Sequence, residues 1–299
     1  MVDRRTFNLG LVTLLAVPVV VRAGVPDGEP VMQLAQRGSS KVYLLGYSDA
    51  YDLAWFTPRI QHAVDESVEL WLETPPGSAE SAATGSSRPP ADADTVASVI
   101  AERGYDRSRD LFDVLPSPLA KRTLEWAARL GIERQTLAPM RPWYARFTIQ
   151  QAYGATKQQK AAPGAKLVWP EAAVVDRARA RHIAISSEYP TIASLIRFFA
   201  DLPGDAQPEY LEEELDYLDD DAKRAVKGMT GWTRGHPEPV YLDQMRTRRP
   251  ALYRAMHVER NAAWADRIER MLARQGTHFI MIGQNHVLGP DSIQANLER

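Results

Sequence analysis

Hydrophobic and polar positions alternate in a strand–helix–strand pattern near the start of the chain. Residues 41–46 form a short hydrophobic run closed by glycine, which is typical of a buried strand. Residues 53–65 place hydrophobic side chains at helical spacing, and residues 69–73 form a second strand-like run. The pattern predicts a β-α-β unit whose two strands are parallel neighbours joined by a right-handed connection.

The rest of the chain has mainly helical spacing until one last strand. Helices are predicted over residues 93–129, 143–153, 188–202, 209–227 and 258–275, with short strand pieces near Val168 and over residues 182–185. Residues 279–283 form the last buried strand, and residues 291–297 form a closing helix. We therefore expect an α/β fold with a central mixed or parallel sheet, flanked by helices and carrying a large helical insertion in the middle.

Two segments lack these periodicities. Residues 24–40 have the composition of a linker, and residues 75–92 are rich in Ser, Ala, Gly and Pro, which predicts a mobile loop rather than a domain linker. We expect one α/β domain over residues 41–299. A second subdomain in the helical middle stays open, since no boundary marks it.

The composition excludes several kinds of active site and disfavours some partners. The chain of 299 residues contains no cysteine, so thiolate catalysis, disulfides and cysteine-bound metal are excluded. A net charge of −2 and a pI of about 6.3 do not favour a nucleic-acid partner, which usually needs a clustered basic surface. After residue 25 no run reaches the ~20 hydrophobic residues of a membrane-spanning helix.

The N-terminus has the features of an export signal. Arg4 and Arg5 precede a hydrophobic run over residues 9–21, and Ala23 ends a small-residue cleavage motif, so residues 1–23 are predicted to be a signal peptide. The paired arginines favour the twin-arginine type, although Asn8 is a poor match to it. The mature protein is then periplasmic or secreted, without stable membrane insertion. An ordinary secretory signal and an uncleaved anchor are the alternatives.

Polar side chains follow several of the predicted strands. The first and last strands each run through a glycine to a polar residue three positions later, Asp49 after Gly46 and His286 after Gly283. Glu73 ends the second strand, and Glu188 follows the short strand over residues 182–185. Ligands bind at the carboxyl edge of open α/β sheets, so these side chains are candidates for one site.

The order and spacing of these residues resemble the TraB/GumN family, which is related to the Tiki proteases and to the erythromycin-esterase and ChaN-like proteins. The resemblance rests on Tyr43-Leu-Leu-Gly-Tyr-Ser-Asp49, Leu72-Glu73, Glu259-Arg-Asn-Ala-Ala-Trp264 and Ile282-Gly-Gln-Asn-His286-Val-Leu-Gly289. It extends over most of the mature chain, and its fold would match the α/β expectation. Each motif alone is weak, but their combination is fairly specific.

The resemblance implies a hydrolytic site. The family pattern has two Gly-x-x-His motifs, an acidic residue after the second strand and an Arg-Asn pair. The resemblance implies that the histidines and the acidic residue hold a divalent metal or activate water for hydrolysis. Glu73, Arg260, Asn261 and His286 fill the expected places here, and Glu188 is a further acidic candidate.

The first motif departs from the family pattern, because Asp49 stands where the family has histidine. Asp49, Glu73 and His286 would then form a metal set with one histidine and two carboxylates, which favours Mn²⁺ or Mg²⁺ over Zn²⁺, with Co²⁺ a further choice.

We therefore expect an exported, divalent-metal-dependent hydrolase that acts on a peptide or ester bond of a peptide or small-molecule substrate. Arg260 would neutralise the developing oxyanion and Asn261 would orient the substrate. The alternative is a catalytically degenerate protein that binds a small molecule or a cell-envelope partner; a weaker third reading is haem capture. The remaining histidines are interpreted as surface or core residues: His62, His182, His236, His257 and His278. The oligomeric state stays open.

Overall fold

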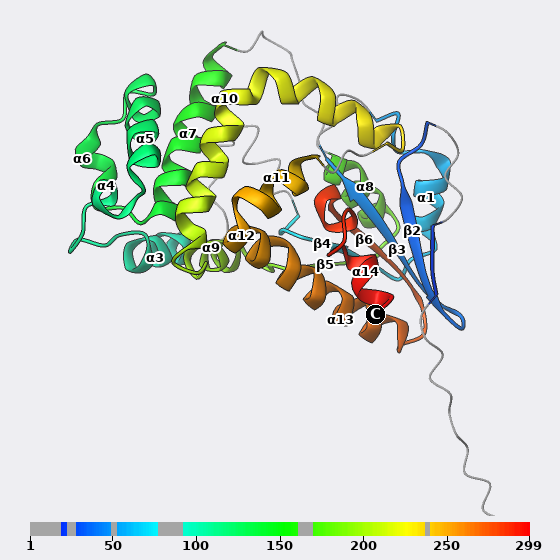
Figure 1. Cartoon of the computed structure of the whole chain (residues 1–299). Coiled ribbons are helices and arrows are strands. Elements are labelled where there is room, and N and C mark those ends of the chain that lie inside the picture. Colours follow the sequence, from blue (N-terminus) through cyan, green and yellow to red (C-terminus); the bar gives the residue numbers. More distant parts are fainter. Residues whose placement is uncertain (1–18, 23–27, 49–52, 77–91, 161–169, 237–239) are drawn as a thin grey trace, which may run out of the picture.

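The computed structural model describes residues 19–22, 28–48, 53–76, 92–160, 170–236 and 240–299 (Figure 1). Within them, a six-stranded sheet has the order β1-β2-β3-β6-β4-β5. The strands are β1 (Val19–Arg22), β2 (Met32–Arg37), β3 (Ser40–Tyr47), β4 (Glu69–Leu72), β5 (Ala184–Ser187) and β6 (Thr277–Gly283). β2 is antiparallel to both of its neighbours, β1 and β3, whereas β3, β6, β4 and β5 are parallel. The predicted α/β fold with a mixed sheet is confirmed.

The last strand in sequence lies in the middle of the sheet. β6 pairs with β3 on one side and with β4 on the other, so Met281 lies between Leu45 and Leu72. The prediction that the first two strands of the β-α-β unit are neighbours is therefore wrong, although they are parallel. The reason lies in β6, where five consecutive residues are buried, a pattern that requires a neighbour on both edges and cover on both faces.

Alternate side chains of the strands build two hydrophobic layers. Leu45, Phe279 and Met281 face α1 (Pro58–Asp65) and α8 (Pro170–Ala180). Leu44, Ile280 and Ile282 face α13 (Arg260–Leu272) and α14 (Ile293–Leu297) on the opposite side. Because successive side chains of a strand point to opposite faces, one hydrophobic run supplies both layers.

A helical lobe forms the middle of the chain and lies beside the sheet (Figure 1). Its helices are α3 (Ala93–Arg103), α4 (Leu111–Val114), α5 (Ser117–Arg129), α6 (Arg134–Leu137), α7 (Pro142–Lys160), α9 (Ile192–Ala200), α10 (Ala206–Thr233), α11 (Val240–Arg248) and α12 (Pro250–Tyr253). The long α10 connects lobe and sheet, since Trp232 near its end packs against Trp55, with ring centroids 5.3 Å apart. The predicted helical insertion is thus present.

The segment expected to be a linker contains ordered structure. Residues 24–40 include β2, which pairs with β3 from Met32↔Leu45 to Arg37↔Ser40. Gly38 has φ +58°, so it supplies the left-handed conformation of the tight hairpin turn. The linker prediction is wrong here because the alternation in β2 is broken by polar Gln33, which is nevertheless buried.

Two predicted helices are present but begin later in the sequence than expected. The helix predicted over residues 53–65 begins only at Pro58, which fits the first turn because it needs no free N–H. The helix expected over residues 188–202 begins at Ile192 behind a capping box of Thr191 and Ser194. Most of the loop predicted over residues 75–92, and the strand piece near Val168, lie outside the described residues.

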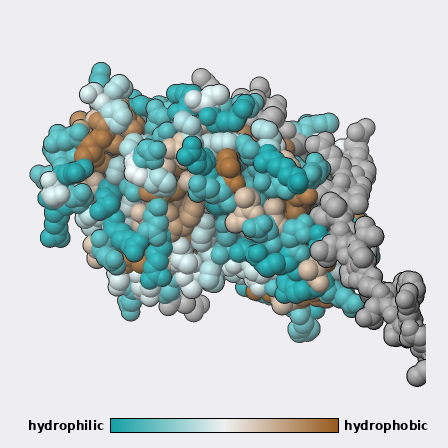
Figure 2. Space-filling model, turned by 60° about the horizontal axis from the view of Figure 1, so that its bottom comes forward, coloured by the Kyte–Doolittle hydropathy of each residue, from teal (hydrophilic) through white to brown (hydrophobic). Residues whose placement is uncertain are grey.

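No helix in the described part of the chain is long and hydrophobic enough to span a bilayer. The face in Figure 2 carries mainly hydrophilic residues, with hydrophobic ones in several patches between them.

Candidate functional site

Two glutamates meet one arginine at the carboxyl edge of the parallel strands. Glu73 directly follows β4 and Glu188 directly follows β5, and the Glu188 N–H donates to the carbonyl of Leu72 at 2.8 Å. Arg260, the first residue of α13, donates from Nη2 to Glu73 Oε1 at 2.8 Å and to Glu188 Oε2 at 2.5 Å, and from Nε to Glu188 Oε1 at 3.0 Å. Adjacent parallel strands thus bring the two carboxylates to one guanidinium.

His286 joins this cluster in a fixed orientation. Its Nδ1 lies 2.6 Å from Asn261 Oδ1, while Asn261 Nδ2 donates to the carbonyl of Asp291 at 2.7 Å. Because that carbonyl fixes the amide group, Asn261 Oδ1 must accept and His286 Nδ1 must carry a proton. The other ring nitrogen, Nε2, is 3.2 Å from Glu73 Oε1.

Both oxygens of Glu73 have partners. Oε1 receives Arg260 and His286, and Oε2 accepts the N–H of Gly283 at 2.6 Å. Burial alone would raise the pKa of Glu73, but the charges and hydrogen bonds of His286 and Arg260 lower it. Glu73 is therefore held as a carboxylate.

Arg260 is enclosed as well as paired. Trp264 Nε1 donates to Glu188 Oε2 at 3.0 Å, and the guanidinium lies 5.6 Å from the ring centroids of Tyr189 and Phe198. Burial lowers the pKa of Arg260, but the two glutamates raise it by more, so it stays charged. Two carboxylates and one guanidinium leave one negative charge, which a proton on His286 or a bound cation would compensate.

Sequence reasoning missed a third glutamate beside this cluster, and this one is buried. Glu171, in the first turn of α8, accepts a hydrogen bond from the Tyr47 hydroxyl at 2.6 Å. Burial raises the pKa of Glu171 to about 7, and the charge of Glu73 adds to the effect. The only signal in the sequence is an acidic residue at the start of the hydrophobic run Ala172–Val175, because its proximity to Tyr47 depends on the packing of α8 on the sheet.

A second histidine also contacts the site. His257 lies in a π-helix, Arg254–Glu259, and its ring centroid is 5.2 Å from that of His286. Burial, together with the charges of His286 and Arg260, lowers the pKa of His257 to about 3, so the ring is neutral. Sequence reasoning took His257 for a surface or core residue; it is a core residue, and it also lies against His286.

The donors of the expected metal set are only partly described. Glu73 and His286 are in contact, whereas Asp49 lies outside the described residues. Among the described residues, no group of three His, Asp or Glu side chains is arranged to hold a metal ion. His286 nevertheless has the arrangement of a metal ligand, with Nδ1–H held by Asn261 and Nε2 beside a carboxylate. The described residues thus offer two donors of the expected metal set, and Asp49, its third member, lies outside the described residues.

Fold and site together define an α/β protein with a buried, charged cluster at the carboxyl edge of its parallel strands. The model of the TraB/PrgY/gumN family matches residues 31–299, so the chain belongs to this family. Neither the curated proteins nor the solved structures provide a match.

Proposed function

We propose that this chain is an exported hydrolase of the TraB/GumN type that cleaves a peptide or ester bond. The observation that carries the proposal is the chain of contacts from Asn261 through His286 to Glu73, beside the Arg260–Glu188 pair. Burying such charges is costly and gives little net stability. Their position at the carboxyl edge of the sheet favours a role in chemistry.

Each side chain has a role in this proposal. His286 Nε2 exchanges a proton with the reacting centre, Asn261 holds the ring, and Glu73 stabilises the imidazolium that forms. Arg260 Nη1 has no hydrogen-bond partner among the described residues, so it is the donor left for a developing oxyanion. Glu171, with its pKa near neutrality, is a second group able to donate or accept a proton.

A divalent cation, Mn²⁺, Mg²⁺, Co²⁺ or Zn²⁺, fits the excess negative charge of the cluster. Glu73 and His286 would hold it together with Asp49. When bound, such an ion polarises the scissile carbonyl and lowers the pKa of a bound water.

Metal content tests the proposal. Protein purified without chelator is analysed for bound elements and titrated with Mn²⁺ by calorimetry. His286→Ala should lose the metal, whereas the control His278→Ala should retain it. His278 lies on β6 and is buried like His286, but it contacts Glu69 instead of the cluster. Equal metal content in wild type and His286→Ala would exclude the metal site, and hydrolysis of a p-nitrophenyl ester or a fluorogenic peptide tests the reaction itself.

One observation favours a binding protein without catalysis as the alternative. Both oxygens of Glu73 already have protein partners, which leaves this carboxylate less available to a metal or a water. Asp49→His restores the family residue and separates the two functions. A degenerate enzyme should gain metal affinity or hydrolysis from this change, whereas an enzyme built around Asp49 should lose activity.

A further inference from the structure

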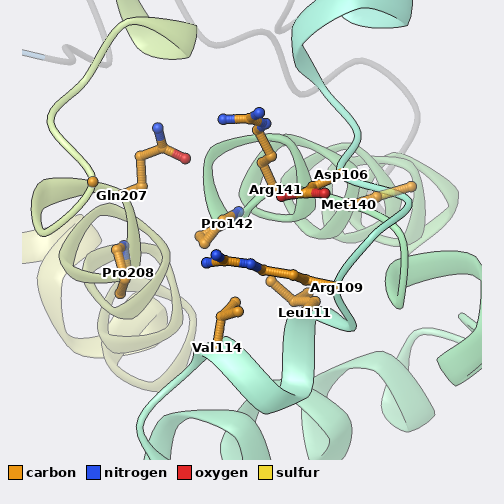
Figure 3. A pocket seen from close by; sticks show the side chains of 10 residues that line it. Asp106, Arg109, Leu111, Val114, Met140, Arg141, Pro142, Gln207 and Pro208 are labelled. Atoms are coloured by element: carbon orange, nitrogen blue, oxygen red, sulfur yellow. The ribbon is translucent and has the colours of Figure 1, made fainter.

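A separate cavity of about 200 Å³ lies in the helical lobe (Figure 3). It is bounded by the segment before α4, by α4 itself, and by the first turns of α7 and α10, and it shares no lining residue with the site described above. Pockets for drug-sized ligands measure about 300–1,000 Å³. A ligand of this cavity is therefore a small molecule or a single residue of a larger one.

The lining of the cavity carries a net positive charge, since it contains two arginines, Arg109 and Arg141, and one aspartate, Asp106. Figure 3 shows the Arg109 guanidinium extending across it, with Arg141 also in the lining. Neither side chain forms an ion pair or hydrogen bond with another described residue, whereas nearby Arg134 is paired with Asp110 at 2.7 Å. The one acidic lining residue, Asp106, accepts hydrogen bonds from the backbone N–H and hydroxyl of Ser108, at 3.1 and 2.6 Å. The charges of Arg141 and Arg109 also act on Asp106, but one carboxylate balances only one of the two guanidinium groups.

The lining also has a hydrophobic part. Leu111 and Met140 are buried, and the remaining hydrophobic lining residues are Val114, Pro142 and Pro208. Such a surface would not contribute to binding a hydrated inorganic ion, but it would shelter an aliphatic group attached to an anion. Arginine suits a carboxylate especially well, because its planar guanidinium donates two parallel hydrogen bonds.

We propose that this cavity binds an organic carboxylate with a short aliphatic side chain, in the form of an N-acylated amino acid or the C-terminal residue of a peptide. Arg109 and Arg141 hold the carboxylate, and the side chain lies against Leu111 and Met140. The site is independent of the hydrolytic cluster, so it stands whether or not that cluster is catalytic.

Calorimetric titration of the full chain with N-acetyl-leucine tests the proposal. N-acetyl-leucinamide, which has the same shape without the charge, should bind at least roughly tenfold more weakly, the loss expected when one charge-assisted hydrogen bond is missing. Arg109→Gln and Arg141→Gln should each weaken binding of the acid by a similar factor. The control Arg107→Gln should not, because Arg107 is a neighbouring exposed arginine outside the lining.

Three results would overturn the proposal: equal affinity for acid and amide, unchanged affinity in both arginine variants, or inorganic phosphate binding as tightly as N-acetyl-leucine. Both arginines are exposed, so thermal unfolding should show that the variants fold like wild type. Acetyl-Ala-Ala-Leu distinguishes the two sources of the ligand. Tighter binding of this peptide assigns the site to peptide C-termini, and equal binding assigns it to single acylated amino acids.

Discussion

At the scale of single residues, the site separates two buried carboxyl groups by their surroundings. Glu73 contacts Arg260, His286 and a backbone N–H, and its pKa is lowered although burial acts in the opposite direction. Glu171 accepts a hydrogen bond from Tyr47, and burial raises its pKa to about 7. Pairs of carboxyl groups whose pKa values are pushed apart in this way are characteristic of acid–base sites. Glu73 is the permanent anion, and Glu171 exchanges its proton near neutral pH.

Glu171→Gln should remove a pH-dependent loss of stability. Between pH 4.5 and about 7 the glutamate ionises in the unfolded chain but keeps its proton in the folded chain, so the free energy of unfolding falls as pH rises through this window. The fall amounts to about 3 kcal/mol for a shift of this size. Urea unfolding from pH 4 to pH 8 measures this effect. The free energy of unfolding of Glu171→Gln, relative to that of wild type, should rise by roughly this amount across the range.

Tyr47→Phe is the companion variant for this measurement. The Tyr47 hydroxyl donates the hydrogen bond that lowers the pKa of Glu171, so the variant should raise this pKa further. The pH range over which the free energy of unfolding falls should then extend to higher pH. If the wild-type and Glu171→Gln curves run parallel from pH 4 to pH 8, Glu171 titrates normally in the folded protein, and its assigned role is wrong.

At the scale of elements, the parallel strands were predictable from the sequence but their order in the sheet was not. Residues 41–46, 69–73 and 279–283 have the hydrophobic pattern of strands and form β3, β4 and β6. The central place of β6 depends on pairing across more than 200 residues of sequence, which local periodicity does not encode. The hairpin from β2 to β3 was overlooked because its signal, Gly38 between two short runs, resembles ordinary loop composition.

Gly46, near the end of β3, lies so close to the turn that follows β6 that no larger residue fits there. A Cβ at Gly46 would lie 2.3 Å from Val287 Cγ2 and 3.1 Å from Gln284 Cα, both in the 3₁₀ turn that carries His286. Gly46→Ala should therefore destabilise the protein by about 1–3 kcal/mol, the usual cost of overpacking a core. It should also displace His286, so metal affinity or hydrolysis should fall more than stability alone explains.

Urea unfolding at pH 7 measures the effect of Gly46→Ala, and two variants interpret it. Gly154→Ala is the control, because Gly154 lies inside α7 with no atom near its missing Cβ, and this change should stabilise by about 0.5–1 kcal/mol. Adding Val287→Ala to Gly46→Ala should restore part of the loss, which would appear as a coupling between the two positions. A neutral Gly46→Ala would mean that the turn can move away without cost.

At the scale of the whole molecule, the candidate site is assembled from four distant parts of the chain. The ends of the strands were enough to bring Glu73, Glu188 and His286 together as candidates, because parallel strands end at one edge, and the family resemblance added Arg260 and Asn261. The long-range packing of α8 and of the π-helix, which adds Glu171 and His257, has no local signature. Strand ends and motifs therefore indicated most of the cluster, and the structure added Glu171 and His257, whose positions depend on how α8 and the π-helix pack.

The first strand of the sheet, β1, lies within the predicted signal peptide, so removal of the signal peptide would also shorten the sheet. β1 (Val19–Arg22) pairs with β2 in the full chain, yet cleavage after Ala23 would remove it. The loss should be tolerated, since β1 is a four-residue edge strand and β2 remains paired with β3 over its whole length. We expect the intact mass of the exported protein to correspond to a chain that begins at Gly24.

Replacing Arg4 and Arg5 together by lysine should keep the precursor in the cytoplasm, because the twin-arginine pathway recognises the arginine pair. Full export of that variant would point to an ordinary secretory signal instead. A mature protein that retains residues 19–22 would contradict the cleavage site and would make β1 a permanent edge of the sheet. Mass spectrometry of the periplasmic and cytoplasmic fractions separates these outcomes, because each leaves a chain with a different N-terminus or location.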